Sequence, residues 1–201
     1  LDIKQFAGLN KKCLFNQNIP FDLSVKKSRF ELNEHSDKGE IPQTVIGQGN
    51  TLMTPFHNAL LMCAVANDGV LMKPYVIDHI EGADNTTVKE NIPEIYADLM
   101  SKKDAKKLQK MLREVVTDGT GYSLDTDLYT AAGKTGTAEN EGKYAHAWFV
   151  GYSNVEDPDL VVCVLVENTG AGSKYAVPIA KKIFNSYYNN NMKEYYGEKK
   201  N

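Results

Sequence analysis

Arginine is scarce in this sequence of 201 residues, where only Arg29 and Arg113 represent it. The remaining cationic side chains are lysines scattered among acids, and the formal net charge is −3 with a pI near 5.8. Because bidentate contacts to phosphate depend on arginine, this composition argues against a nucleic-acid partner.

Cysteine is nearly as rare, and Cys13, Cys63 and Cys163 lie too far apart for the spacings typical of metal ligands. Cys63 and Cys163 each stand inside an apolar run, so both are expected to be small buried residues. The sequence therefore predicts no metal and no other cofactor. Cysteine usage alone does not decide the redox compartment.

Apolar runs of membrane-spanning length and a signal-peptide pattern are also missing. The sequence begins with Leu1 rather than Met, inside a stretch where Ile3, Phe6 and Leu9 have helical spacing. That beginning is typical of a piece of a longer protein or of a processed product. With 42% hydrophobic and 24% charged residues, the composition is that of a globular domain, or of most of one.

Two helices have clear N-terminal signals. Thr54 can cap a helix whose first residue is Pro55, and this helix is apolar almost all round and should be central. Asn67-Asp68-Gly69 should end it. Ser101, with Asp104 at the third position, can cap a second helix. This second helix has an apolar stripe made of Leu108, Met111, Leu112, Val115 and Val116. The opposite face carries Lys102, Lys103, Lys106, Lys107 and Lys110. We interpret this lysine face as solvated rather than as a site for an anionic partner.

The segment before Thr54 has weaker signals. After the first helix, an extended connector is expected around Pro20, and residues 24–42 are polar and should form an irregular surface segment. A glycine-rich turn, Ile46-Gly47-Gln48-Gly49-Asn50, leads to Thr54. Beyond the central helix, Leu71 to Ile80 is expected to form one strand.

Three strands and a helix are predicted in the last third of the chain. The strands are Ala131 to Ala138, His146 to Ser153 and Leu160 to Glu167, joined by short polar turns as an antiparallel meander. The third is apolar throughout, so both of its faces should be covered. The helix should begin near Ser173 and bury Ile179, Ala180, Ile183, Phe184 and Tyr187. The predicted fold class is α/β (α+β), an antiparallel sheet flanked by helices.

The first of these strands has an unusual composition for a strand. Small residues flank Lys134, Thr135, Gly136 and Thr137, so the backbone should be open to a ligand, with a fixed positive charge and two hydroxyls beside it. A polar edge strand without a ligand is one alternative. A phosphate-binding loop is another, but it requires glycine where Leu128 stands and requires the lysine to open a helix.

Lys134-Thr135-Gly136-Thr137, followed by the strand that begins His146-Ala147-Trp148-Phe149, resembles the third active-site motif of penicillin-binding proteins, the D,D-transpeptidases that cross-link peptidoglycan. Three further segments resemble the same family, in the same order: Ile46-Gly47-Gln48-Gly49 with Thr54-Pro55, Asn67-Asp68-Gly69-Val70 with Lys73-Pro74, and Val115-Val116 with Gly119-Thr120-Gly121. The resemblance covers nearly the whole chain.

The other two motifs of that family differ. The sequence has no Ser-x-Asn, and its one Ser-x-x-Lys, Ser24 to Lys27, follows Pro20 in extended, charged sequence where the two side chains would not share a helix face. Ser24 is therefore interpreted as an ordinary exposed residue. The resemblance implies that residues 1–201 are the C-terminal part of one transpeptidase domain: 1–53 a connector region, 54–130 helices and a small strand, and 131–190 the meander sheet and last helix.

The resemblance also implies roles for the lysine strand. Lys134 provides positive potential near the nucleophile, the hydroxyls of Thr135 and Thr137 bind the substrate carboxylate, and the backbone N–H of Thr137 is an oxyanion donor. Gly136 keeps the strand accessible. Trp148 is either a wall of the substrate groove or core packing, with packing favoured. Gln48 and Gly49 are expected to approach the cleft, whereas His57 and His146 are expected to be structural or solvent-facing.

Two functions follow from this resemblance. One is a D,D-transpeptidase fragment that binds D-alanyl-D-alanine peptides and β-lactams through a serine outside this chain, and is inactive alone. The other is a non-catalytic β-lactam sensor or interaction domain of the same fold. The implied partners are the peptidoglycan stem peptide, β-lactams and the remainder of the domain. Without that remainder, the strand Leu160 to Glu167 would be an apolar edge prone to self-association. The parent protein is expected to be extracytoplasmic and membrane-anchored.

Overall fold

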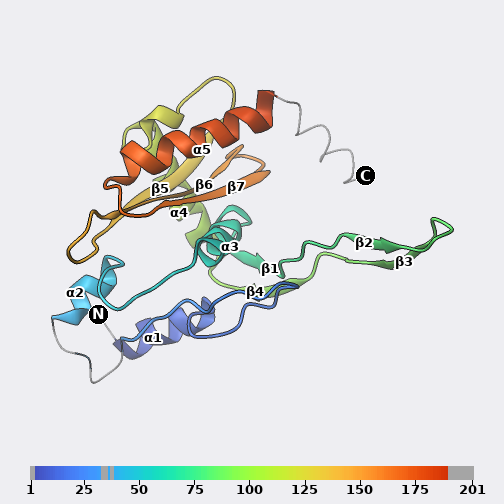
Figure 1. Cartoon of the computed structure of the whole chain (residues 1–201), viewed down its shortest axis with the longest axis horizontal. Coiled ribbons are helices and arrows are strands. Elements are labelled where there is room, and N and C mark those ends of the chain that lie inside the picture. Colours follow the sequence, from blue (N-terminus) through green and yellow to red (C-terminus); the bar gives the residue numbers. More distant parts are fainter. Residues whose placement is uncertain (1–2, 33–35, 37–38, 190–201) are drawn as a thin grey trace.

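A three-stranded antiparallel sheet lies at the centre of the computed structural model, which describes residues 3–32, 36 and 39–189. Its strands, β5 (Ala131–Ala138), β6 (His146–Ser153) and β7 (Leu160–Val166), stand in the order β5-β6-β7. Helix α5 (Gly172–Asn189) covers one face, and helices α3 (Pro55–Ala66) and α4 (Lys102–Thr117) pack on the other (Figure 1). The predicted meander is confirmed, with β7 ending one residue before Glu167.

Each face of the sheet has its own apolar core. Phe149 and Val164 pack with Phe184 on the α5 side, while Val150 and Tyr152 pack with α3 and α4 on the other. Because strand residues alternate between faces, β6 contributes to both cores. In α5, Ala180 and Phe184 are buried as predicted, but Ile179 and Ile183 are about 40% exposed (40% and 41%) because they lie on the outer side of the helix.

Helix α3 begins as the sequence indicates. The Thr54 hydroxyl accepts a hydrogen bond from the His57 backbone N–H (3.2 Å), and Gly69 follows the helix with φ +95°, a conformation that favours glycine. The prediction that Cys63 is buried is wrong, because this residue faces away from the sheet and is exposed; Cys163, on β7, is only half-buried. Within the described residues, α3 is thus covered on one side and not on the other.

Helix α4 is capped by Ser101 as predicted, and its lysines are exposed. Lys102 and Lys106 form ion pairs with Asp68, with N–O distances of 2.9 Å and 2.8 Å. Met111, predicted in the apolar stripe, is 60% exposed. The buried face instead follows the spacing of Ala105, Gln109, Leu112 and Val116, and Gln109 donates a hydrogen bond to the Val65 carbonyl.

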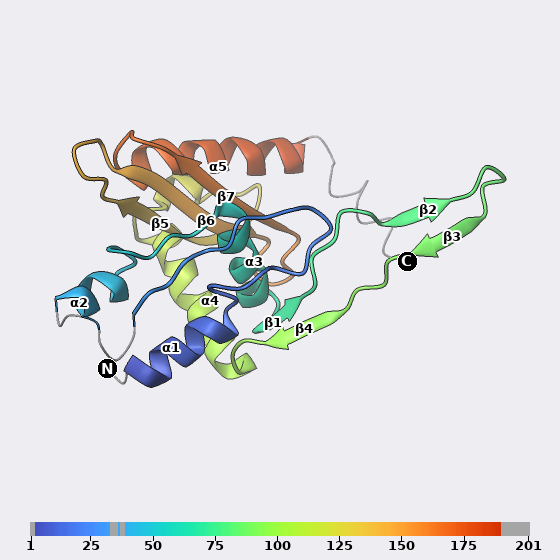
Figure 2. The ribbon, with the colours of Figure 1, turned by 60° about the horizontal axis from the view of Figure 1, so that its bottom comes forward.

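The single strand predicted for Leu71 to Ile80 is wrong, because two short strands occupy this segment. β1 (Val70–Met72) pairs with β4 (Ile95–Asp98), and β2 (His79–Glu81) pairs with β3 (Thr87–Glu90). Pro74 lies between them and has no N–H for a sheet ladder. The β2–β3 ribbon extends away from the rest of the molecule (Figures 1 and 2).

The N-terminal part is better ordered than the sequence suggests. Helix α1 (Ile3–Lys12) is as predicted. Within 24–42, residues 33–35 and 37–38 lie outside the described residues, and the described remainder is not simply an irregular surface segment. Phe30 and Leu32 are buried, and Phe30 packs edge-on against Phe6 and Phe15. An unpredicted helix, α2 (Glu40–Val45), includes Pro42 in its first turn, where a missing N–H is tolerated. No described helix is both long and apolar enough to cross a bilayer.

Candidate functional site

Strand β5 carries the lysine motif at one edge of the sheet, where β6 is its only strand partner among the described residues. Gly136 lies opposite Trp148, and Thr137 lies opposite Ala147. Ala131 belongs to the core on the α5 side of the sheet, and Ala132 to the core on the other side. Because strand residues alternate between faces, Thr135 and Thr137 lie on the α5 side. Lys134 and Gly136 lie on the opposite side. The structure thus brings Lys134, Thr135, Gly136 and Thr137 to one exposed strand edge.

Three side-chain donors show which backbone groups point off that edge. Arg113 Nη1 donates to the Ala131 carbonyl (2.9 Å), Lys134 Nζ to that of Thr135 (2.8 Å), and Gln48 Nε2 to that of Thr137 (3.2 Å). All three acceptors are odd-numbered residues of β5. In an antiparallel ladder, the N–H and C=O of one residue point to the same side. The N–H groups of Thr135 and Thr137 therefore also point away from β6.

The threonine hydroxyls are held by neighbouring elements. Thr135 Oγ1 lies 2.6 Å from Thr120 Oγ1, in the loop after α4. Thr137 Oγ1 accepts a hydrogen bond from the backbone N–H of Gly172 (3.4 Å), the first residue of α5. The N-terminus of a helix carries partial positive charge, so it adds to the positive potential of the exposed Lys134 ammonium. Both features favour a negatively charged ligand group at this edge.

Gly172 permits this close approach of α5. A Cβ atom at this position would lie under 3.0 Å from the backbone carbonyl oxygens of both Gly136 and Trp148. Gly136 is less constrained, since a Cβ atom added there would lie 3.1 Å from Cβ of Trp148. Trp148 itself is half-buried, and it packs against the strand at Gly136.

The two histidines have structural contacts, as expected. His57 is buried against the Phe15 ring, with Nε2 at 2.7 Å from the Cys13 carbonyl, and burial lowers its pKa. His146 Nδ1 accepts a hydrogen bond from the Asn168 backbone N–H (3.1 Å). Ser24 lies in an exposed segment without helix, so it shares no helix face with Lys27. None of these residues joins the lysine strand edge.

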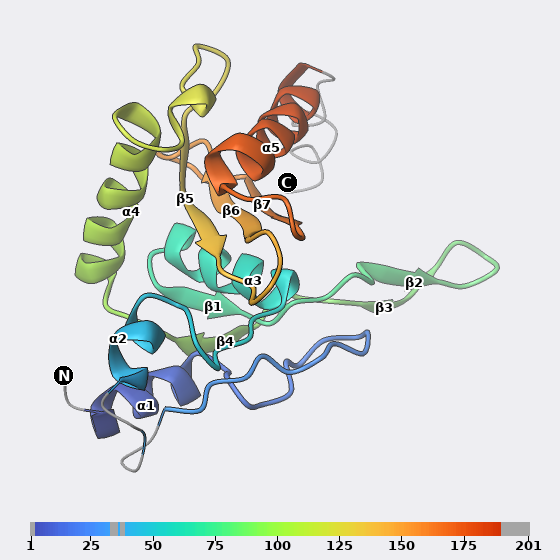
Figure 3. The same cartoon turned by 60° about the vertical axis from the view of Figure 1, so that its left-hand side comes forward.

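Gln48, in the turn after α2, contacts this edge through its hydrogen bond to the Thr137 carbonyl, as the sequence predicts. In Figure 3, α2 and the chain that follows it lie below the end of β5. Gly49 contributes a left-handed backbone conformation (φ +72°) rather than a contact with β5. Sequence reasoning missed three residues: Arg113, Thr120 and Gly172. Thr120 had one signal, because it belongs to the Gly119-Thr120-Gly121 segment, but nothing in the sequence showed that its hydroxyl meets Thr135.

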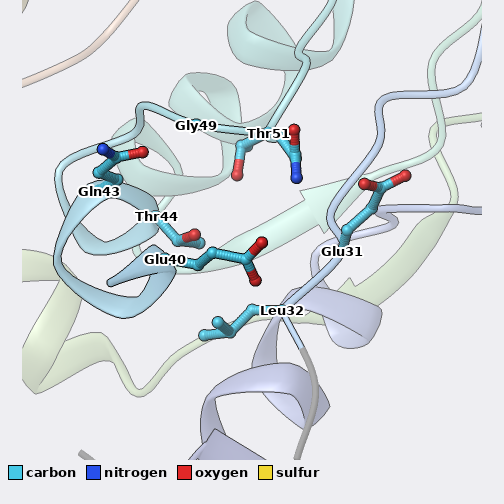
Figure 4. Close-up of a pocket in the computed structure, with 8 residues that line it drawn as sticks. Glu31, Leu32, Glu40, Gln43, Thr44, Gly49 and Thr51 are labelled. Atoms are coloured by element: carbon cyan, nitrogen blue, oxygen red, sulfur yellow. The ribbon is translucent and has the colours of Figure 1, made fainter. Parts of the chain in front are cut away.

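The pocket in Figure 4 is lined by α2, by residues 31–32 and by residues 49–51. It has a volume of about 100 Å³ and contains Glu31 and Glu40, whose charge is wrong for an anionic ligand, and no β5 residue lines it. Over the described part of the chain, no group of three His, Cys, Asp or Glu residues could hold a metal ion. The lysine strand edge is therefore the better candidate site.

Comparison with known proteins gives one family. The sequence model of the penicillin binding protein transpeptidase domain matches residues 4–185. The chain is 34% identical over 176 residues to peptidoglycan D,D-transpeptidase MrdA of Haemophilus influenzae, covering 77% of this chain and 27% of that protein. It is 31% identical over 156 residues to peptidoglycan D,D-transpeptidase PbpA of Mycolicibacterium smegmatis, covering 72% and 31%.

A solved structure agrees with these matches. The imipenem acyl-enzyme complex of penicillin-binding protein A from M. tuberculosis superposes with a TM-score of 0.80 and 26% identity, over 89% of this chain and 40% of that one. The chain spans about a third or less of the two curated relatives described above, 31% and 27% of their lengths. From the family match and the shared fold, this chain belongs to the penicillin-binding protein transpeptidase domain family.

Proposed function

We propose that this chain forms one wall of a serine D,D-transpeptidase site whose nucleophile lies outside residues 1–201. The observation that carries the proposal is the edge of β5, where outward backbone N–H groups, two threonine hydroxyls and an exposed lysine meet. Such an edge can bind the carboxylate and the developing oxyanion of an acyl-transfer reaction. It contains no serine, and the hydroxyls of Thr135 and Thr137 are hydrogen-bonded to Thr120 and to the Gly172 N–H rather than to a general base.

Each residue of the strand then has a distinct role. The Lys134 ammonium stabilises negative charge on the substrate and near the serine, and the hydroxyls of Thr135 and Thr137 bind the terminal carboxylate. The outward N–H of Thr137 donates to the oxyanion, and such a donor is typically worth about 3–4 kcal/mol of transition-state stabilisation. Thr120 and Gly172 hold the two hydroxyls in place.

The proposed substrate is a peptidoglycan stem peptide ending in D-alanyl-D-alanine, with β-lactams as acylating analogues. Two observations support it: the relatives are named peptidoglycan D,D-transpeptidases, and one similar structure is an imipenem acyl-enzyme. In this proposal residues 1–53, 54–130 and 131–190 are successive parts of one domain, in an extracytoplasmic protein anchored to the membrane outside this chain.

The remainder of that domain is the proposed partner of the open edge of β7. Among the described residues, β7 pairs with β6 alone, and its apolar sequence leaves an edge open to another strand. When this chain is isolated, we expect that edge to drive self-association.

The alternative function is a non-catalytic β-lactam sensor or interaction domain of the same fold. The relatives' names favour the enzyme, whereas the sequence of this chain, which has no Ser-x-Asn and only the exposed Ser24 in a Ser-x-x-Lys, fits both functions. Turnover of a D-alanyl-D-alanine peptide by the serine-containing protein would favour the enzyme, and stable acylation without turnover would favour the sensor.

Labelling with a fluorescent penicillin tests the proposal. We expect residues 1–201 alone to remain unlabelled and the protein that contains this chain with its serine motifs to be labelled. Lys134→Ala should slow labelling of that protein at least tenfold, whereas Lys103→Ala, on the exposed face of α4, should not change it. An unlabelled serine-containing protein, or equal labelling of the Lys134→Ala variant, would contradict the proposal.

A further inference from the structure

Gln48 occupies a backbone acceptor at the candidate site. Its side-chain amide nitrogen lies 3.2 Å from the Thr137 carbonyl oxygen. A carbonyl can only accept, so this contact needs the amide N–H₂ end of Gln48 toward β5. The side chain comes from a turn set by Gly47 (φ +79°) and Gly49 (φ +72°), and the Gln48 backbone N–H donates to the Gln43 carbonyl.

The Thr137 carbonyl does not need Gln48 to fix its position. The ladder with β6 already holds β5 from Ala131↔Ser153 to Ala138↔His146, on both sides of Thr137. An exposed hydrogen bond between neutral groups adds little to such a ladder. The consequence of the Gln48 contact is therefore chemical: it occupies an acceptor beside the outward N–H of Thr137.

A ligand bound as an extended strand would need that acceptor. When two antiparallel residues form a hydrogen-bonded pair, they exchange both N–H···O=C bonds. A ligand group whose carbonyl accepts from the Thr137 N–H therefore presents its own amide N–H to the Thr137 carbonyl. The Thr137 oxygen has two lone pairs, but Gln48 and that ligand N–H both approach it from the side of β5 that faces away from β6, so they compete for the same space and the same oxygen.

We propose that Gln48 is a specificity-determining residue, which caps the Thr137 carbonyl and selects against ligands that offer a backbone-like amide N–H beside the reacting carbonyl. This inference rests on the proposed function. A ligand without that N–H leaves the Gln48 contact intact, whereas a ligand with it must displace Gln48. Removal of the cap should favour only the second kind of ligand.

Two β-lactams provide the comparison. Penicillin G has an acylamino N–H next to its lactam carbonyl, whereas imipenem has a hydroxyethyl group there. We expect Gln48→Ala in the serine-containing protein to raise the ratio of acylation rates, penicillin G over imipenem, by about 2- to 10-fold, the range of one neutral hydrogen bond. Both rates are second-order constants from the same protein preparation.

Two further variants separate this role from a structural one. Gln48→Glu also removes the donor, but its negative charge repels the carboxylate of both β-lactams, so both rates should fall while the ratio still rises. Gln43→Ala is the matched control, because Gln43 lies in α2 beside Gly49 and lines the pocket that contains no β5 residue, and it should leave the ratio unchanged.

The outcomes are distinct. A ratio that rises in both Gln48 variants and not in Gln43→Ala supports the proposal. A ratio that stays at the wild-type value, whether the two rates fall together or do not change, overturns it and leaves Gln48 a structural residue. If the wild-type protein is acylated by neither β-lactam, the proposed function fails instead.

Discussion

Gly172→Ala tests whether α5 reaches the lysine strand as closely as the structure shows. The added Cβ would lie under 3.0 Å from the carbonyl oxygens of Gly136 and Trp148. Both are backbone atoms inside a paired ladder, so no side chain can rotate away, and the N-terminus of α5 must move instead. Overpacking of this kind costs about 1–3 kcal/mol, and we expect the upper end because two rigid atoms are involved.

The expected loss is measurable by thermal unfolding followed by circular dichroism. For a chain of this length, about 3 kcal/mol corresponds to a fall in Tm of about 6–12 °C. The control is Gly8→Ala in α1, where a Cβ would meet nothing within 4 Å. This substitution should stabilise the chain by about 0.5–1 kcal/mol, because alanine loses less backbone entropy in a helix. An unchanged or higher Tm for Gly172→Ala would refute the close packing of α5 on β5 and β6.

Two other substitutions test the contacts around α3 and the sheet. Asp68, paired with Lys102 and Lys106, has its pKa lowered from 3.8 to about 2, mainly by hydrogen bonds from these two lysines. Its contribution is present above the ordinary pKa and is lost as the pH falls toward 2; after screening by solvent it should be about 1 kcal/mol. Urea unfolding of Asp68→Asn should show that loss at neutral pH and a weaker pH dependence in acid, and equal acid slopes would contradict it. Tyr152 has a buried hydroxyl with no partner among the described residues, so Tyr152→Phe should be neutral or stabilising by about 1 kcal/mol. A clear loss of stability in Tyr152→Phe would mean that the hydroxyl has a partner.

The elements with strong local signals could be predicted from sequence. The starts of α3 and α4 are specified locally. The hydroxyl of Thr54 accepts the His57 backbone N–H, and that of Ser101 accepts the Asp104 backbone N–H. The meander was predictable because its strands are apolar runs separated by polar turns. The small residues, lysine and two hydroxyls of residues 134–137 indicated a strand open to a ligand, and the resemblance to the third motif of penicillin-binding proteins, with its flanking segments, favoured this over a plain polar edge strand.

What the sequence could not show depends on contacts between distant segments. Cys63 stands in an apolar helix, yet its exposure depends on which side of α3 meets the sheet. Phe30 is buried because it meets Phe6 and Phe15, which are remote in sequence. The hydrogen bonds of Thr120 to Thr135 and of Gln48 to Thr137 likewise join loops to β5 across the fold.

Identification of the acylated residue tests the central claim most directly. The serine-containing protein is treated with a fluorescent penicillin and digested, and the labelled peptide is sequenced by mass spectrometry. We expect a single labelled serine outside residues 1–201, with Lys134→Ala slowing its formation. A label on Ser24, or on any other residue of this chain, would contradict the account.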